Sequence, residues 1–523
     1  MSLLPGRPVR RLARSTAIFS LATGLSRVLG LVREIVAKNY FGVQGPVNAF
    51  QIAFLVPNTI RALVADAALS SAFVPVFSDL IEKGERKRAW RVASTLFWLT
   101  LLGLGTVTAL FVLIAPWVMP PLYPHHHALL IGLSQVLFPI VALLGVSGII
   151  VGILNTYDEF SVPALTPVAW NLVIIAGLVF GVPHVHGVDH KLYVYAGAIL
   201  AGTVVQVLLP IPWLRGKDGQ LRLVIDWRDP AVKQVFKLML PVTLGLGLIN
   251  INALIDGVLG GWLVTANAPS EIDAAFRIYM LPQGMFSVAV ATVLFPSLAR
   301  YASRNDMVGF RRTSELGLRQ IAFLLVPASI LSAVLAEPIT RLIYQRGAFT
   351  PDQTPIVAAC LAALSAGLAF NGTMLMLNRS FFSLQENWIP TYVALANLFV
   401  NAILDVAFSP LGVWGIPLAT SMVNIAGTAA LLVLLRRRLG GIGFAEVAAS
   451  FVRVLVAALV AGGIAFAVWW SLDSVTGRSL AGQLSSLLPA LIAALLAYFA
   501  AGKLLRVREM QALLSLRSRP RRG

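Results

Sequence analysis

Residues 92–119, VASTLFWLTLLGLGTVTALFVLIAPWVM, decide the fold class, because this stretch carries no charged side chain. A transmembrane helix needs about 20 predominantly apolar residues, so the stretch is long enough to cross a bilayer. Charge-free stretches near or above this length recur along the chain, at residues 161–182, 192–214, 278–299, 354–378, 406–435, 454–472 and 480–502. A lipid bilayer, rather than a soluble core, therefore organises this chain.

The composition excludes a soluble protein. Hydrophobic residues make up 58% of the 523 residues and charged residues 12%, whereas soluble domains carry about 25% charged residues. Six further stretches are apolar apart from a few polar or ionisable residues, at 15–40, 48–80, 128–157, 232–264, 315–344 and 387–405. Together, the stretches predict an all-α polytopic membrane protein with about 14 transmembrane helices.

The basic residues predict the orientation in the membrane. The formal net charge of +18 could also indicate nucleic-acid binding. However, Lys and Arg gather in alternate loops, at residues 83–88, 215–228, 300–312 and 436–438, and the intervening loops hold almost none. This bias is typical of the cytoplasmic loops of membrane proteins. We therefore expect no nucleic-acid partner, and we expect the basic ends of the chain, residues 1–14 and 509–523, to lie in the cytoplasm.

The chain carries a weak internal repeat. Residues 49–52, AFQI, resemble residues 275–278, AFRI, and the stretch from Leu154 to Asn171 resembles the stretch from Leu377 to Asn397. Many transporters consist of duplicated halves with the substrate site between them. We predict two six-helix lobes, residues 15–220 and 221–440, related as parallel pseudo-twofold repeats with a cavity between them.

Four arginines interrupt the apolar stretches: Arg27 and Arg33 in the first, Arg61 in the second and Arg277 near the start of the eighth. A charged side chain at mid-bilayer costs about 3 kcal/mol on insertion scales, so such residues normally face a watery cavity or a partner. Arginine suits phosphate because its planar fork donates paired hydrogen bonds and stays protonated. The arginines therefore predict an anionic substrate, such as a pyrophosphate or a carboxylate.

A structural explanation of these arginines stays open. An arginine near a helix end can extend to the lipid headgroups or pair with an acid inside the protein. Glu34 lies seven residues after Arg27 on the same helical face, and Asp66 could pair with Arg61.

A second set of polar residues is acidic. Asp256 lies within the seventh stretch, and Asn401 and Asp405 lie in the eleventh at a spacing that puts them side by side on one helix face. Oxygen ligands at membrane depth suit a coupling Na⁺ or H⁺. Hydrogen bonding between helices is the alternative explanation.

No catalytic residue is expected. The single cysteine, Cys360, excludes an intramolecular disulfide, and the run His125–His127 lacks the spacing of metal ligands on a helix. The sequence contains no phosphate-binding loop and no serine nucleophile elbow. We expect no enzyme and no cofactor apart from a possible Na⁺.

One motif near the start of the chain is residues 26–34, SRVLGLVRE, which is followed by Pro57-Asn58 and Arg61. In these residues the sequence resembles the MurJ/MviN family of lipid II flippases, and the resemblance is densest there. Later matches are residues 292–300, TVLFPSLAR, residues 346–349, RGAF, and residues 415–421, GIPLATS. It extends over nearly the whole chain.

The resemblance implies a function and a set of binding residues. It implies a bacterial inner-membrane flippase that moves lipid II, the lipid-linked peptidoglycan precursor, by alternating access, and two C-terminal helices within residues 441–508 that form a groove for the lipid tail. It implies that Arg27, Arg33, Arg61, Arg277 and Asn58 contact the head group. It also implies a sodium site at Asp256, Asn401, Asp405 and Thr420. We expect lipid II and membrane lipids as partners and a functional monomer.

Several departures and alternatives accompany this interpretation. The family often has an acid at position 48, where this chain has Asn48, and an acid at position 276, where it has Phe276. A polysaccharide-lipid flippase or a cation-coupled drug exporter of the same superfamily is the alternative within the transporter class. A membrane-embedded enzyme acting on polyprenyl-phosphate sugars and a non-transporting scaffold are the alternatives outside it.

Overall fold

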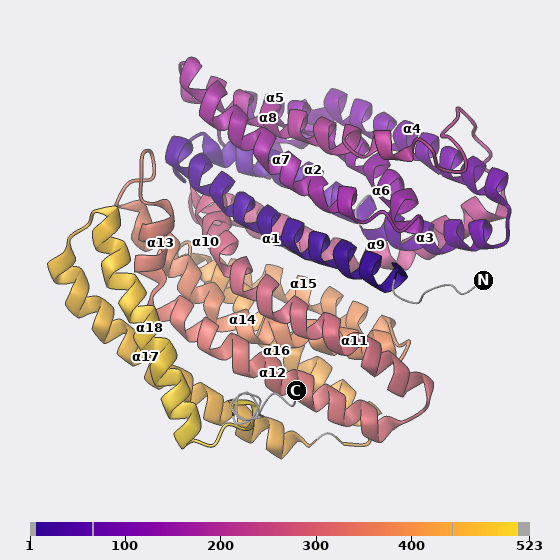
Figure 1. Ribbon diagram of the computed structural model, residues 1–523. Helices are drawn as coiled ribbons and strands as arrows, with labels where there is room; N and C mark the ends of the chain where they lie inside the picture. The colour runs from indigo at the N-terminus through magenta and orange to yellow at the C-terminus, as the bar shows by residue number, and fades with distance from the viewer. Residues whose placement is uncertain (1–6, 65–66, 442, 511–523) are drawn as a thin grey trace. The chain divides into compact units, whose positions relative to one another are not determined.

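The computed structural model describes residues 7–64, 67–441 and 443–510, and helices are the only regular elements in these ranges (Figure 1). The chain divides into two compact units, Met1–Trp262 and Leu263–Gly523. Each unit has its own packed interior. The expected all-α membrane fold is confirmed.

The first unit contains α1 to α9 and a buried apolar core. A large cluster around Phe41, Phe50 and Tyr195 joins α1, α2 and α8, and a second cluster around Phe73 and Trp90 joins α3 and α4. The longer helices of this unit are α1 (Arg7–Phe41), α2 (Val47–Val64), α3 (Ala67–Glu82), α4 (Arg86–Val118), α5 (His127–Leu137), α6 (Ile140–Thr156), α7 (Ser161–Ala176), α8 (Val188–Leu208) and α9 (Pro230–Leu263).

The second unit contains α10 to α18. Its centre is α14, which packs against α10, α11, α12, α13 and α16. The helices are α10 (Ala268–Pro282), α11 (Val288–Ser303), α12 (Met307–Val334), α13 (Ala336–Tyr344), α14 (Gln353–Ser383), α15 (Trp388–Phe408), α16 (Gly415–Arg438), α17 (Phe444–Thr476) and α18 (Leu480–Leu504). A five-residue π-helix, η5 (Gln283–Ser287), joins α10 to α11.

Ten helical segments in the described ranges are long and apolar enough to cross a membrane. They correspond to ten of the expected spans. The stretches 15–40, 48–80, 232–264 and 278–299 coincide instead with α1, with α2 and α3, with α9, and with α10, η5 and α11. Some of these helices are short, and α1 carries several charged residues. The count of fourteen spans therefore stays a prediction.

Two of the predicted stretches contain a break in the structure. The stretch 406–435 begins inside the end of α15, and a short 3-10 turn, η6 (Ser409–Leu411), separates α15 from α16. Gly412, which follows this turn, has a positive φ of 93°, a conformation that glycine adopts without strain. The stretch 315–344 comprises most of α12 together with the short helix α13. The Ser409-Pro410 pair indicated the first break in the sequence, whereas the break at Leu335 was not predicted.

The repeat segment of residues 49–52 lies on α2 and its counterpart, residues 275–278, lies on α10, and prolines recur in both regions. In the first unit α2 and α3 each contain a proline, Pro57 and Pro75. In the second unit Pro282 ends α10 and Pro296 lies inside α11. The packing groups α9 with the first unit. The sequence repeat instead places α9 in the second lobe, which was predicted to begin at residue 221. The division into lobes of residues 15–220 and 221–440 stays a prediction.

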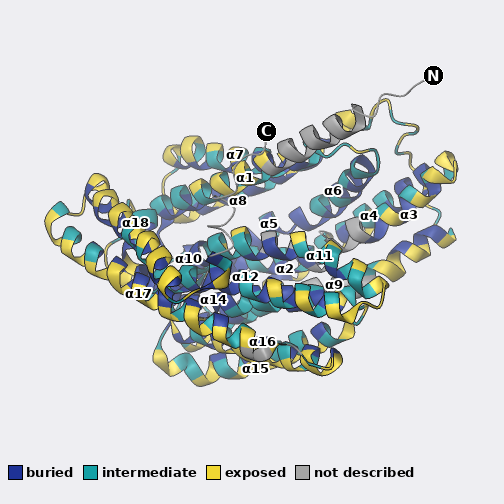
Figure 2. Cartoon of the chain, turned by 60° about the horizontal axis from the view of Figure 1, so that its bottom comes forward, coloured by how far each residue is buried: buried dark blue, intermediate teal, exposed yellow. Residues whose placement is uncertain are grey.

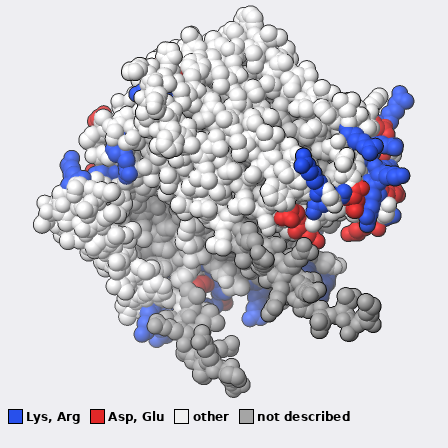
Figure 3. All heavy atoms as spheres, turned by 45° about the horizontal axis from the view of Figure 1, so that its top comes forward, with Lys and Arg blue, Asp and Glu red and all other residues white. Residues whose placement is uncertain are grey.

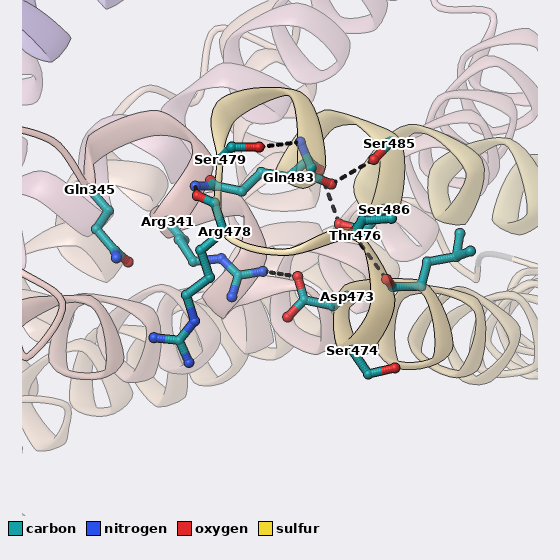
Figure 4. Close-up of polar contacts among 12 residues, drawn as sticks. Arg341, Gln345, Asp473, Ser474, Thr476, Arg478, Ser479, Gln483, Ser485 and Ser486 are labelled. Atoms are coloured by element: carbon teal, nitrogen blue, oxygen red, sulfur yellow. Dashed lines mark hydrogen bonds and ion pairs between the residues drawn. The ribbon is translucent and has the colours of Figure 1, made fainter.

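The helices α17 and α18 form a hairpin whose outward faces are exposed (Figure 2). Its apolar core packs on the end of α12 and on α13 through Leu335, Trp469 and Leu487. A partly buried ion pair adds a polar link, because the buried Arg341 of α13 donates to the carboxylate of Asp473 of α17 (Figure 4). The Arg341 guanidinium also lies 5.9 Å from the ring centroid of Trp469.

Charged side chains gather at the margins of the face seen in Figure 3, and a broad area of that face shows none.

Helix α18 ends near Leu504, and Ser479 caps its start by accepting a hydrogen bond of 3.1 Å from the Gly482 amide. Capping matters at the ends of such helices because the first four N–H groups of a helix have no partner within it.

Candidate functional site

Arg33 of α1 is held by three partners from two helices. Its Nη2 donates to Glu34 Oε1 at 2.5 Å, and its Nη1 donates to Asn171 Oδ1 of α7 at 3.3 Å. The guanidinium lies 4.7 Å from the ring centroid of Trp170. The side chain is 11% exposed. Arg33 is therefore a largely buried cation whose direction is set by α7.

Arg27, six residues earlier on α1, lies in a different environment. Its side chain is exposed. Glu34, a possible partner of Arg27 by its spacing in the sequence, makes its short contact with its neighbour Arg33. The two arginines of α1 thus differ in burial, although their sequence contexts are similar.

Arg61 and Asn58 of α2 contact each other directly. The Asn58 Oδ1 accepts hydrogen bonds from Arg61 Nε at 3.2 Å and from Arg61 Nη2 at 2.9 Å. Both donors lie on one edge of the guanidinium, so the amide fixes its plane. The adjacent Thr59 bonds to the Asn250 carbonyl of α9 at 3.3 Å, which ties this turn of α2 to α9. Asp66, the other expected partner of Arg61, lies outside the described residues.

Asn48 has a structural position at the start of α2. Its Nδ2 donates to the carbonyl oxygens of Val43 and Gly45 at 3.0 and 3.1 Å, and the residue is fully buried. An ionised aspartate has no donor and could not make these bonds. The amide at position 48 therefore serves the turn between α1 and α2.

In the second unit, Arg277 of α10 pairs with Asp273, one turn earlier, at 3.0 Å. The Arg277 side chain is 31% exposed. The family often has an acid at position 276, where this chain has Phe276. The acid that pairs with Arg277 here lies four residues before it. The i, i+4 spacing of Asp273 and Arg277 was a readable signal.

The residues of the expected cation site lie in both units. In the first unit the Asn252 amide donates to both carboxylate oxygens of Asp256, at 3.3 and 3.2 Å. In the second unit Asn401 Nδ2 donates to Asp405 Oδ2 at 2.9 Å, and both residues are buried. Thr420 Oγ1 donates to the Ile416 carbonyl of its own helix at 3.4 Å.

The donor set of these residues suits a small hard cation, because carboxylate, amide and hydroxyl oxygens are the ligands that such ions prefer. The described residues contain no group of three or more His, Cys, Asp or Glu side chains that could hold a metal ion. Amide, hydroxyl or backbone oxygens would have to complete a site at Asp256 or at Asp405.

Four residues that the sequence analysis did not assign to the site contact its members. They contact Arg33, Asp256 and Arg277, and they are Trp170, Asn171, Asn252 and Asp273. Asn252 and Asp273 could have been found from their spacing of four residues to a site residue. Asn171 and Trp170 are more than a hundred positions from Arg33, so only the packing of α7 on α1 reveals them.

Comparison with known proteins identifies the family. Residues 37–482 match the family model described as "Lipid II flippase MurJ". A probable lipid II flippase MurJ of Vibrio cholerae serotype O1 is 32% identical over 432 residues, which is 79% of this chain and 81% of that protein.

Solved structures agree with this assignment. A lipid II flippase MurJ in an inward closed conformation matches with a TM-score of 0.77 and 25% identity, over 93% of this chain and 98% of that one. An inward-facing multidrug resistance MATE family transporter of the MOP superfamily matches at a TM-score of 0.67 and 17% identity, over 81% and 94% of the two chains. The second likeness shows the fold alone.

Proposed function

Because the chain belongs to the lipid II flippase MurJ family, we propose that it translocates lipid II across the bacterial cytoplasmic membrane, from the inner to the outer leaflet. The family match extends from residue 37 to residue 482, and the relative from Vibrio cholerae is a probable lipid II flippase. The multi-span helical fold suits a transporter of a lipid. This family is one of transporters, and we propose that the chain carries out no covalent chemistry.

The observation that supports the substrate class is the orientation of Arg61. Asn58 engages Nε and Nη2 on one edge of the guanidinium, which fixes the plane of the guanidinium. A diphosphate accepts paired hydrogen bonds from such a fixed fork. We propose that Arg61 binds the diphosphate of lipid II together with Arg27, Arg33 and Arg277, and that Asn58 positions Arg61.

The transport cycle is alternating access. The charged head group would enter a site open to the cytoplasm, and a conformational change would then expose it to the other side. The membrane potential can bias such a cycle, because moving a unit charge through 100 mV is worth about 2.3 kcal/mol. Both termini would lie in the cytoplasm throughout, and one copy of the chain would be sufficient.

The test is complementation of flippase-depleted cells, with an assay for lipid II exposed on the outer leaflet. We expect Arg61→Ala to abolish rescue. Arg61→Lys should restore little of it, because a lysine ammonium lacks the planar fork of paired donors that a guanidinium has. Asn58→Leu should weaken transport although it retains the arginine. Arg312→Ala, at an exposed position of α12, is the control and should rescue fully.

Full rescue by Arg61→Ala and Arg27→Ala at matched expression would contradict the head-group site. A drug exporter would instead give a drug-resistance phenotype without a change in exposed lipid II. A membrane-embedded enzyme would convert lipid II to a product of different mass, and a scaffold would tolerate every substitution of these arginines.

We further propose that Na⁺ binds at the oxygen ligands of Asp256, Asn401, Asp405 and Thr420. The buried Asn401–Asp405 pair supports this, because it places carboxylate and amide oxygens, the ligands that small hard cations prefer, side by side. Sodium chloride should raise the thermal midpoint of the purified protein relative to choline chloride. Asp405→Asn should remove that difference, and an unchanged difference in this variant would exclude Asp405 as a ligand.

A further inference from the structure

A cavity of about 210 Å³ lies in the second unit, away from the arginines discussed above. Three elements far apart in the sequence line it. Arg319 comes from α12, Glu446, Ser450 and Arg453 come from the first part of α17, and Val507 and Arg508 come from the segment that follows α18. The proposed head-group site uses none of these residues, and those of α17 and of the segment after α18 lie within residues 441–508, where the resemblance implies a groove for the lipid tail.

Ion pairs hold the walls of the cavity together. Arg319 Nε lies 3.2 Å from Glu509 Oε1, and Arg508 Nη1 lies 2.8 Å from Glu446 Oε2. Ser450 also donates to Glu509 Oε2 at 3.2 Å. These contacts connect α12, α17 and the segment 505–510 after α18, so the cavity is a built feature of the fold.

The cavity has an excess of positive charge. Arg319 and Arg508 face Glu446 and Glu509, whereas Arg453 makes no ion pair with any residue in the described ranges. Its side chain is exposed and lines the cavity. An anion with several oxygen atoms could bind Arg453 and the outer N–H groups of Arg508 without disturbing the ion pairs.

The cavity lies at the depth of the lipid headgroups, as judged from the sequence around it. Arg453 immediately precedes the charge-free stretch 454–472, and Arg508 follows shortly after the stretch 480–502. The ends of two apolar spans therefore meet at this cavity. Headgroup phosphates occupy this boundary between hydrocarbon and water.

An exposed apolar stripe continues from Arg453 along α17. Val456, Val460 and Ile464 follow at helical spacing and are 43%, 46% and 40% exposed. The stripe gives an acyl chain an apolar surface that begins one turn after Arg453 on the same helix. A free anion would make no use of such a surface, so the arrangement favours a lipid over a soluble phosphate.

We propose that this cavity binds the phosphate of an anionic membrane phospholipid, with Arg453 and Arg508 as donors and an acyl chain lying along Val456, Val460 and Ile464. Basic pockets between transmembrane helices on the cytoplasmic side are a known way to bind anionic headgroups. The proposal does not depend on lipid II transport. Its consequence is that anionic lipid joins α12, α17 and the segment after α18.

Native mass spectrometry of the purified full-length protein tests this, with phosphatidylglycerol and phosphatidylcholine as separate probes. We expect the wild-type protein to retain phosphatidylglycerol preferentially. Arg453→Gln and Arg508→Gln should each weaken retention about fivefold, the factor for one surface Arg contact. Lys503→Gln is the matched control, because Lys503 is an exposed basic residue at the end of α18 that does not line the cavity.

Unchanged phosphatidylglycerol retention in Arg453→Gln would overturn the proposal. Equal retention of the two lipids would do so as well. A separate arm compares inorganic phosphate with phosphatidylglycerol in thermal stabilisation of detergent-solubilised protein, and equal stabilisation at equal concentration would assign the cavity to a free anion. Because Arg453 makes no ion pair in the described ranges, the thermal midpoint of Arg453→Gln without anionic lipid should equal that of the wild type, which separates binding from folding.

Discussion

Replacing Gly367 with alanine should separate α14 from α16. A Cβ atom at Gly367 would lie 2.7 Å from both the Cα and the Oγ of Ser421. Because the Cα is backbone, rotation of the serine side chain cannot relieve the overlap. The two helices are also joined by hydrogen bonds, since the Ser421 hydroxyl accepts from the Gly367 amide at 3.1 Å and donates to the Ala363 carbonyl at 2.6 Å.

Two opposing effects set the magnitude. Inserting a methyl group into a well-packed interior costs about 1–3 kcal/mol. Alanine is favoured over glycine inside a helix by up to about 1 kcal/mol, which offsets part of that cost. Because the overlap is with backbone, the upper part of that range, about 2–3 kcal/mol, applies, and we expect Gly367→Ala to lower the free energy of unfolding by about 1–2 kcal/mol.

Cys360 provides the assay. It is the one cysteine of the chain, it is buried, and it lies on α14 two turns before Gly367. A thiol-reactive fluorescent dye therefore reports the opening of α14 itself during a thermal ramp. We expect a lower midpoint for Gly367→Ala than for the wild type.

Gly463→Ala is the control. Gly463 lies inside α17, and a Cβ atom there would meet no heavy atom within 4 Å. The gain in helix preference should therefore leave its midpoint unchanged or raise it. If Gly367→Ala has a midpoint at or above that of the wild type, the close approach of α14 and α16 is not what stabilises this interface.

Two further predictions concern ion pairs. Asp473→Asn should destabilise the attachment of the α17–α18 hairpin by about 3 kcal/mol, because it leaves the buried guanidinium of Arg341 without its carboxylate. Faster proteolysis at the loop between α17 and α18 should report this loss. The exposed control Asp352→Asn should not change the cleavage rate. In the first unit, the hydrogen bond from Arg88 lowers the pKa of Asp229 below its ordinary value of 3.8. The carboxylate therefore stabilises the contact of α4 with the start of α9 above that pH, and the stabilisation is lost as the pH falls through the lower pKa of the folded state. Asp229→Asn should reduce the loss of thermal stability between pH 5 and pH 3, and an equal loss in variant and wild type would exclude this pair as its source.

The sequence alone predicted several features of this protein because they follow from local composition. Apolar stretches long enough to span a bilayer predicted the all-α membrane fold, because backbone polar groups in lipid need hydrogen-bond partners within the protein and a helix supplies them within its own segment. Arginines such as Arg61 stood out because charge is costly within those stretches. Pairs at i, i+4 spacing, such as Asn401–Asp405, were predicted for the same local reason, since helix geometry alone brings them together.

The tertiary structure decided which residues meet from distant parts of the chain. Asn171 and Trp170 contact Arg33 because α7 packs on α1, and Arg319 pairs with Glu509 because the segment after α18 returns to α12. In a bilayer, lipid and protein side chains are similarly apolar, so helix association depends on close packing and interhelical hydrogen bonds rather than on hydrophobicity. A hydropathy pattern contains little of that information, and for this reason the partners of the charged residues appear only in the folded molecule.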